Sequence, residues 1–273
     1  MNNVDMSNGK ELDKRTFHKW REKISETFDL DVECDLSTYC YYIANASNLK
    51  NGSAGKWLLD TFSVSNALAD CKSIKNRILL ENIPSDVEYL QPIVDAMKAS
   101  QMLHITYRRY LNDEEREHYI MPLCVKLYRQ RWYMVGRHWN DAGTGHTTVF
   151  CLDRIRGIRP SSHTFDYPID FSPEEFFRYY LGGITGENTK PRTIKLKVDA
   201  YQANYMRSLP LHESQEEIER NDDYSIFTMF VRPTIDLLQE ILWNMDRVEV
   251  LEPMEVRKMA KGMIGKMDEI YTE

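Results

Sequence analysis

The spacing of apolar and polar positions changes several times along the chain, and each change marks a new element. Over residues 15–28, apolar side chains recur every three or four residues, which predicts a helix with an apolar stripe for a core. Asp13 can cap its start. The stripe consists of Phe17, Trp20, Ile24 and Phe28. Residues 30–43 then alternate around a turn, which predicts a β-hairpin.

A helix followed by a hairpin is the back half of a winged helix, so residues 1–45 are predicted to be a partial winged-helix DNA-binding region. A basic surface helix beside an unrelated hairpin is the alternative. The residues predicted to face DNA are Arg15, Thr16, His18, Lys19, Arg21 and Lys23. The short stretch before this helix has no room for the two further helices of a winged helix, each about 10–14 residues long. We therefore expect either that the chain is truncated at its start or that its DNA-binding region is incomplete. DNA binding by this chain is expected to be weak.

The middle of the chain changes from helical to strand patterning. Residues 46–100 are predicted to be a helical linker, with Ile78 and Leu79 among its apolar positions. Five short strands follow within 101–160, where Pro122 predicts an edge strand or a bulge because proline cannot donate a ladder hydrogen bond. This pattern predicts a small β-barrel of the Sm or SH3 type.

The last third begins with an acidic connector, residues 161–190, which contains a predicted helix over 173–181. Residues 191–273 then follow the order β-α-β-β-α-β, with one extra helix at the end, which predicts a ferredoxin-like domain. The chain as a whole is predicted to be α+β. The extra helix carries an apolar row that favours a homodimer: Met259, Met263, Ile264, Met267 and Ile270.

Charge is distributed unevenly. The chain carries 35 basic and 42 acidic residues, a formal net charge of −7, which by itself speaks against nucleic acid. The predicted barrel, however, has ten basic residues against six acidic ones, and the segment 14–23 has five against one. Local basic patches attract phosphates more than net charge does. The composition therefore leaves nucleic-acid binding open at two places.

Other signals exclude whole classes of protein. The five cysteines are scattered without zinc-site spacing, and the histidines form no metal-binding pair, so neither a metal nor a cofactor is expected. Unpaired thiols favour a reducing compartment. The start is polar, and no apolar run approaches the length of about 20 residues that a membrane helix needs. A cytoplasmic protein is predicted.

Several motifs occur together in order. The barrel segment contains "ITYRRY", "IMPLCV", "RWYMVG" over 131–136 and "VFCLDRI" over 149–155. The later part contains "TIKLKV", "LPLHESQ", "FVRPTIDLLQEILW" and "VEVLEP". Together they resemble the WYL-domain transcriptional regulators with their WCX extension, over roughly residues 87–273. Met134 replaces the leucine of the family name, and Cys151 stands where many members carry an arginine.

The resemblance implies an Sm-like barrel that senses a nucleotide or nucleic-acid ligand and regulates a fused DNA-binding domain. It implies a homodimer and no catalysis. Tyr107, Tyr133 and Arg154 match the family's pocket positions, and Arg131, Arg137 and His138 are further candidates on one strand. We expect the first three to converge on one mouth of the barrel.

Each of these residues also has a structural interpretation. Arg154 would form a salt bridge within the barrel, and the tyrosines would be core aromatics with satisfied hydroxyls. An enzyme is disfavoured: the acidic run 114–117 falls at a turn, and the glycines of 182–186 lack the lysine of a phosphate-binding loop and follow a helix. A non-catalytic dimeric scaffold that binds nucleic acid or a protein partner without reading DNA by itself is the second hypothesis.

Overall fold

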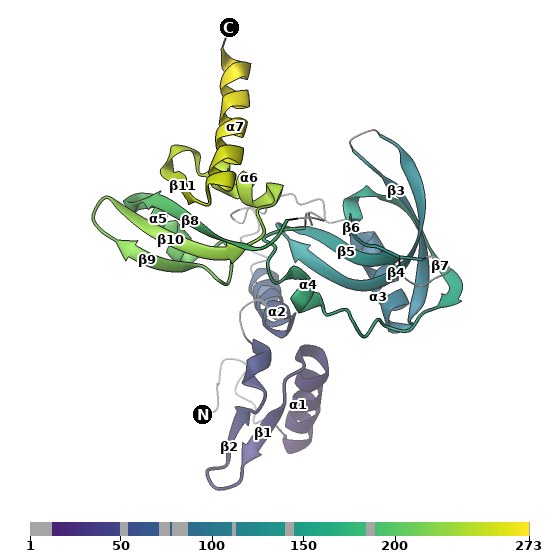
Figure 1. Cartoon of the computed structure of the whole chain (residues 1–273). Helices are drawn as coiled ribbons and strands as arrows, with labels where there is room; N and C mark the ends of the chain where they lie inside the picture. Colours follow the sequence, from purple (N-terminus) through teal and green to yellow (C-terminus); the bar gives the residue numbers. More distant parts are fainter. Residues whose placement is uncertain are drawn as a thin grey trace. The chain divides into compact units, whose positions relative to one another are not determined.

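The computed structural model describes residues 13–49, 54–70, 77, 87–110, 113–139, 145–183 and 189–272. The chain divides into two compact units, Met1–Glu81 and Asn82–Glu273, and each is described by itself (Figure 1). Helices and antiparallel sheets are mixed throughout, so the predicted α+β class is confirmed. Some residues named in the predictions lie outside the described residues. They are Ile78 and Leu79 of the predicted helical linker, Cys71, and the segments 111–112, 140–144 and 184–188.

The N-terminal unit contains the predicted helix and hairpin. Helix α1 spans Lys14–Phe28, strands β1 and β2 span Val32–Asp35 and Cys40–Ile43, and helix α2 spans Ala54–Asp70. The Asp35 carboxylate closes the turn between the strands by accepting hydrogen bonds from the Ser37 backbone N–H, at 2.8 Å, and from the Thr38 hydroxyl, at 2.9 Å. Bonds from the Ser37 hydroxyl and backbone, and from Thr38, lower the pKa of Asp35 to about 2.

The apolar stripe of α1 is buried only at its end, which corrects the expectation of a core along its length. Phe28 is buried and meets the ring of Phe62 in α2 at a centroid distance of 5.8 Å, whereas Trp20 is 52% exposed and Ile24 39%. A helix of 15 residues is about 22 Å long. Strands of four residues reach only about 13 Å, so the hairpin cannot cover the helix. Asp13 occupies the N-cap position but makes no side-chain capping bond.

The last part of the predicted linker belongs to the barrel instead. Helix α3 spans Leu90–Lys98, after a 3-10 turn over Val87–Tyr89. Ile93, with no exposed surface, and Ala96 lie in the same apolar cluster as Leu103 and Ile105 of the barrel. Helix α3 is therefore part of the barrel core, which sequence spacing alone did not reveal.

The barrel has the five predicted strands. They are β3 (Gln101–Arg108), β4 (Glu115–Tyr128), β5 (Arg131–His138), β6 (Thr147–Cys151) and β7 (Ile155–Thr164). All pair antiparallel in the order β6-β5-β4-β3-β7, and a 3-10 turn over Leu152–Arg154 separates β6 from β7. The last strand thus returns beside the first, as a small barrel of the Sm or SH3 type requires.

Pro122 marks a bulge and not an edge. Strand β4 lies between β3 and β5, and its register with β5 shifts between Pro122 and Cys124. The extra residue on β4 accommodates a proline in a central strand, because the local ladder bond is already lost there. Of the two predicted alternatives, the bulge is correct.

Alternation along β5 decides which side chains face the core. Met134 is fully buried and Trp132 packs partly buried against the same cluster, so Tyr133 points to the opposite face. Gly136 also faces inward, where a Cβ atom would lie 2.1 Å from Ile120 Cγ2. The backbones of β4 and β5 approach closely at this point because no side chain stands between them.

The connector holds a helix shorter than predicted. Helix α4 spans Pro173–Phe177 and is capped by the Ser172 hydroxyl, which accepts a hydrogen bond from the Glu175 backbone N–H at 3.4 Å. The chain leaves the helix because the Tyr179 carbonyl accepts a hydrogen bond from the Arg232 backbone N–H at 2.8 Å. This contact fixes the connector next to the following domain.

The C-terminal domain has the predicted ferredoxin-like order and one extra helix. Its elements are β8 (Arg192–Asp199), α5 (Ala200–Ser208), β9 (Glu216–Arg220), β10 (Tyr224–Val231), α6 (Ile235–Trp243), β11 (Val248–Glu252) and α7 (Met254–Tyr271). The antiparallel sheet has the order β11-β8-β10-β9. One apolar cluster joins residues of β8, α5, α6 and α7, among them Leu196, Ala203, Leu237 and Val256.

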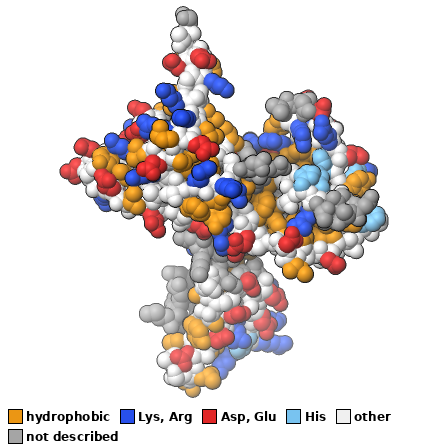
Figure 2. Space-filling model, in the orientation of Figure 1, with side chains coloured by type: hydrophobic (Ala, Val, Ile, Leu, Met, Phe, Trp, Pro, Cys, Tyr) orange, Lys and Arg blue, Asp and Glu red, His pale blue; other side chains and the backbone are white. Residues whose placement is uncertain are grey.

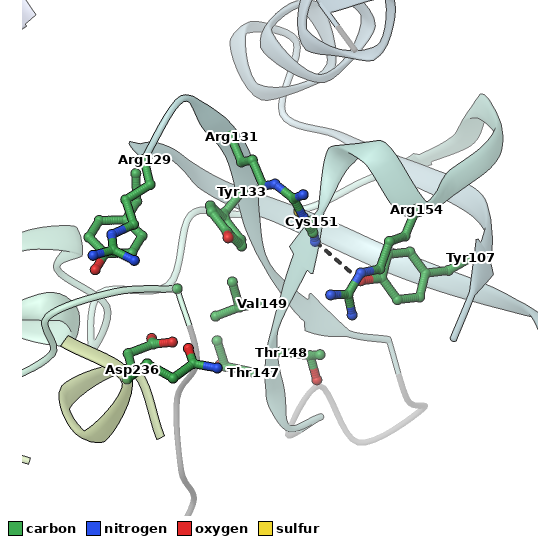
Figure 3. Close-up of a pocket in the computed structure, with 13 residues that line it drawn as sticks. Tyr107, Arg129, Arg131, Tyr133, Thr147, Thr148, Val149, Cys151, Arg154 and Asp236 are labelled. Atoms are coloured by element: carbon green, nitrogen blue, oxygen red, sulfur yellow. Dashed lines mark hydrogen bonds between the residues drawn. The ribbon is translucent and has the colours of Figure 1, made fainter. Parts of the chain in front are cut away.

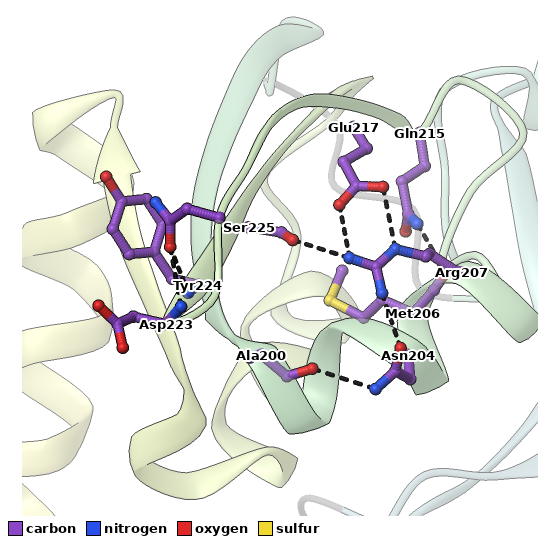
Figure 4. Close-up of polar contacts among 10 residues, drawn as sticks. Ala200, Asn204, Met206, Arg207, Gln215, Glu217, Asp223, Tyr224 and Ser225 are labelled. Carbon is purple, nitrogen blue, oxygen red and sulfur yellow. Dashed lines mark hydrogen bonds and ion pairs between the residues drawn. The ribbon is translucent and has the colours of Figure 1, made fainter.

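Two features of this domain bear on later arguments. Arg207 of α5 bonds both carboxylate oxygens of Glu217 in β9, at 2.9 and 2.7 Å, and the hydroxyl of Ser225 in β10, at 2.9 Å (Figure 4). Helix α7 buries only Val256 and Ala260, and its C-terminal half extends beyond the sheet (Figure 1). No helix in the described part of the chain is both long and apolar enough to cross a membrane.

Candidate ligand-binding site

Four of the six predicted ligand residues line one cavity, of about 590 Å³, on the barrel (Figure 3). Tyr107, Arg131, Tyr133 and Arg154 come from β3, β5 and the 3-10 turn after β6. The other lining residues are Tyr128, Arg129, Thr147, Thr148, Val149, Cys151, Gly183, Asp236 and Gln239. The three residues expected at one mouth of the barrel therefore lie together, and this space is the first cavity below.

Tyr107 combines a core ring with a polar end. Its side chain is 8% exposed and packs edge-on against Phe150 at 5.1 Å between centroids. Its hydroxyl accepts a hydrogen bond from the Cys151 backbone N–H at 3.2 Å, the dashed line in Figure 3. Burial raises the pKa of Tyr107, which keeps the phenol protonated. Only the hydroxyl end reaches the cavity, so this ring is not available for base stacking.

Tyr133 is the aromatic surface of the first cavity. It is half-buried, and burial raises its pKa to about 12. One side of the ring is covered by the backbone of Gly183, where a Cβ atom would lie 2.7 Å from Tyr133 Cε1. The close approach requires glycine at position 183. Because the connector covers part of the ring, the remaining face is the one a ligand can contact.

Arg154 is held in place without having its hydrogen bonds satisfied. Its guanidinium carbon lies 4.3 Å from the centroid of the Tyr110 ring, a cation–π contact. The buried Nε has no hydrogen-bond partner among the described residues, and the nearest carboxylate oxygen, on Asp153, is 3.9 Å away. Asp153 instead pairs with Arg131 at 3.0 Å. The predicted salt bridge to Arg154 is thus long, and its side chain, which is 35% exposed and lines the cavity, can contact an anion there.

The sequence did not predict the part of this site that is formed by residues later in the chain than the barrel. Asp236 and Gln239 of α6 line the cavity, although α6 lies in the C-terminal domain. Arg129, in the β4–β5 turn, forms an ion pair with Glu240 of α6. Arg129 and Gln130 both have positive φ, of 47° and 65°, as a tight hairpin turn between twisted strands requires. No spacing in the sequence relates this turn to a helix more than a hundred residues later.

The other two candidates lie elsewhere. Arg137 pairs with Asp170 of the connector at 3.3 Å and does not line the first cavity. His138 lines a second cavity, of about 530 Å³, which adjoins the first because Tyr107, Thr148, Val149 and Arg154 line both. The strand alternation that separates Arg137 from His138 explains why one strand cannot bring both into the same site.

The predicted DNA-facing residues are divided between two exposure classes. Arg15, His18, Lys19 and Lys23 are exposed, whereas Thr16 and Arg21 are half-buried. Arg15, Lys19 and Lys23 are four residues apart and form one row along α1, as helix geometry requires. This row is the part of the predicted set that a phosphate backbone can reach at once.

The described residues contain no group of three or more metal-ligating side chains placed around one point. Burial raises the pKa of Cys151 to about 11, so its thiol is neither a ligand nor a nucleophile at neutral pH. A barrel with an Sm-like strand order carries a cavity lined by arginines and tyrosines, and a domain with ferredoxin-like order follows it in the chain. Together these features define the architecture of an α+β protein with a polar cavity on a small barrel.

Comparison with protein families agrees with this architecture. Residues 88–160 match the WYL domain and residues 190–267 match the WCX domain. The chain belongs to the WYL-domain transcriptional regulator family, as its motifs predicted. The WYL match begins inside the segment predicted to be a linker, which agrees with the place of α3 in the barrel. No curated protein matches the sequence.

Two solved structures are similar to this chain. Proteasome accessory factor B/C (PafBC) of Arthrobacter aurescens is 17% identical, with a TM-score of 0.33 over 95% of this chain and 40% of that one. A CRISPR Cas-related protein is 10% identical, with a TM-score of 0.46 over 98% of this chain and 76% of that one. The chain thus spans 40% of the PafBC chain that it matches.

Proposed function

We propose that this protein is a non-enzymatic transcriptional regulator that binds DNA and responds to a nucleotide or short single-stranded nucleic acid held in the first cavity. The observation that carries the proposal is the partly exposed side chain of Arg154 in the same cavity as Tyr133. An arginine fork supplies a bidentate contact to a phosphate, and an aromatic face supplies stacking to a base.

The surroundings favour a polar anionic ligand over an apolar one. Arg129 and Arg131 line the same cavity, together with the hydroxyls of Thr147 and Thr148. Asp236 of α6 also lines the cavity and lies below Arg129 in Figure 3. The three arginines favour a ligand that carries a phosphate group.

DNA binding rests on the row Arg15, Lys19 and Lys23 of α1, directly before a hairpin. Such a row supplies phosphate contacts, which position a protein on DNA. A regulator of this kind would act as a homodimer in the cytoplasm, a reducing compartment in which Cys34, Cys40, Cys124 and Cys151 stay unpaired.

The alternative is a dimeric scaffold without DNA reading of its own. The observation that favours it is the apolar groove between α6 and α7, of about 720 Å³, lined by Leu242, Trp243, Met263, Met267 and Ile270. A tight dimer that binds neither DNA nor a nucleotide would support this alternative.

Calorimetric titration of nucleotides and short single-stranded oligonucleotides tests the ligand site. Arg154→Ala should weaken binding roughly ten- to a hundredfold, because it removes charge-assisted hydrogen bonds worth about 1.5–3 kcal/mol. Arg156→Ala is the matched control, since Arg156 is exposed on β7 and lines neither cavity. Unchanged affinity together with a lowered melting temperature in Arg154→Ala would assign Arg154 a purely structural role.

A further inference from the structure

The second cavity gathers an unusual set of basic side chains. Arg109 and Tyr110 follow β3, Arg116 and His118 lie on β4, His138 lies on β5, His146 precedes β6, and Arg154 follows it. No carboxylate is among the described residues that line this space. Figure 2 shows pale-blue histidines beside blue Lys and Arg side chains on the barrel. Three arginines and three histidines, with no carboxylate among the described lining residues, form a site for negative charge.

The three imidazoles are packed against one another and not against acids. His138 and His146 stack with centroids 4.1 Å apart and planes 21° apart, and His118 meets His138 edge-on at 5.2 Å. Their ring nitrogens form no hydrogen bond or ion pair with another described residue. Burial, and then the neighbouring histidines and Arg109, lower the pKa of His138 to about 4. Burial, Arg109, Arg116 and His146 likewise lower the pKa of His118.

The arginines of this cavity are partly free. Arg116 is bonded to Glu114, at 2.6 Å, and that carboxylate is itself exposed. Arg109 is exposed, and its side chain has no hydrogen bond or ion pair with another described residue. Arg154 lines both cavities, and its side chain is 35% exposed. The site therefore has hydrogen-bond donors ready for an anion, besides the imidazoles.

We propose that the second cavity is a separate binding site for a phosphate-type dianion, and that the histidine stack takes up a proton when the anion binds. An anion between Arg109 and the stack would stabilise the charged imidazoles of His118 and His138, and so offset the burial and the repulsion that lower their pKa values. The pKa values of His118 and His138 would rise toward neutrality, and affinity would increase as the pH falls. The inference does not depend on a nucleotide in the first cavity.

Inorganic sulfate is a suitable probe, because it keeps one charge state across the pH range in which histidines titrate. Histidine ring signals would be followed by NMR while sulfate is added to the full chain at several pH values. We expect the His118 and His138 signals to shift saturably and their apparent pKa values to rise in sulfate. Signals that do not saturate, or pKa values that do not move, would overturn the proposal.

Matched variants separate this site from the first cavity. Arg109→Gln removes an arginine that lines only the second cavity, and Arg131→Gln one that lines only the first. Arg109→Gln should weaken sulfate binding roughly tenfold, as expected for one charge-assisted hydrogen bond, and Arg131→Gln should leave it unchanged. The reverse pattern would place the anion in the first cavity, and would overturn this inference while supporting the proposed function.

A dinucleotide with a 5′ phosphate identifies the source of the anion. If one ligand spans both cavities, the dinucleotide should shift the histidine signals, and both Arg109→Gln and Arg131→Gln should weaken it. If the anion is a free one, the dinucleotide should leave these signals alone and sulfate should still shift them. Loss of the histidine response to both probes in the wild-type chain would refute the site.

Discussion

At the scale of single residues, the contact between Gly183 and Tyr133 determines how the aromatic surface of the first cavity is presented. A Cβ atom at position 183 would lie within 2.9 Å of three ring atoms of Tyr133. Gly183→Ala should therefore displace the ring and weaken ligand binding several-fold, with an overpacking cost of about 1–3 kcal/mol. Calorimetry and thermal melting measure both effects.

Gly262→Ala is the matched control for that prediction. Position 262 lies in α7, and a Cβ atom there would meet no atom within 4 Å. Alanine should stabilise the helix by about 0.5–1 kcal/mol and leave ligand affinity unchanged. Equal effects of the two substitutions would show that the contact with Tyr133 has no part in binding.

At the scale of elements, the pair between Arg207 and Glu217 joins α5 to β9 (Figure 4). The bond from Arg207 lowers the pKa of Glu217 from 4.5 to about 2. A carboxylate with a depressed folded-state pKa stabilises the fold above its ordinary pKa, and this contribution is lost as the pH falls from about 4.5 to about 2.

Glu217→Gln should accordingly lower the melting temperature at pH 7, and the difference from the wild type should disappear toward pH 2. Thermal melts over that range measure it, with Glu216→Gln, at an exposed position on the same strand, as the control. A difference that stayed constant with pH would mean that the Glu217 charge does not contribute through this pair.

The basic row of α1 makes a prediction about salt. Each phosphate neutralised contributes about −0.9 to the slope of log affinity against log salt for duplex DNA. Lys19→Ala/Lys23→Ala should reduce the slope by up to about twice that amount, whereas Lys258→Ala/Lys261→Ala on α7 should not change it. Phosphate contacts are strongest at low salt, so the slope is measured from low salt upward. An unchanged slope in the Lys19→Ala/Lys23→Ala variant would show that α1 does not contact the DNA phosphates.

Local pattern predicted most elements, since strand alternation and helical spacing are short-range properties. The order β-α-β-β-α-β with one extra helix, predicted for residues 191–273, is confirmed. The predictions that were wrong depend on tertiary contacts, which local patterns do not contain. Trp20 and Ile24 have core spacing, but the described unit offers too little surface to cover them. Helix α4 ends early because the backbone of Tyr179 bonds Arg232, a partner that no local pattern reveals.

Only those residues of the candidate site that the family resemblance or strand alternation indicates could be predicted from the sequence. Tyr107, Tyr133 and Arg154 lie together as expected, while Asp236 and Gly183 enter the cavity through the fold of a later segment. The histidine stack joins residues from three different places in the barrel sequence. Such a cluster has no spacing signature, because sheet register and not sequence distance brings its members together.

At the scale of the whole molecule, we expect a homodimer formed through the apolar side of α7. Trp243, Met267 and Ile270 are exposed along the groove between α6 and α7. Light scattering should give twice the chain mass of 32.2 kDa, and Met267→Glu/Ile270→Glu should give the monomer. Lys258→Glu, outside this groove, is the control. A wild-type monomer at micromolar concentration would refute the dimer.

The position of α3 has a practical consequence for dissecting the chain by expression of fragments. A fragment that started at residue 101 would contain every strand of the barrel. It would expose the apolar surface of the barrel against which Ile93 and Ala96 pack. Such bare apolar surface drives aggregation. A fragment that starts at residue 87, before the 3-10 turn that leads into α3, keeps this surface covered. Insoluble and soluble products from two starts only fourteen residues apart would thus report the thermodynamic role of one nine-residue helix.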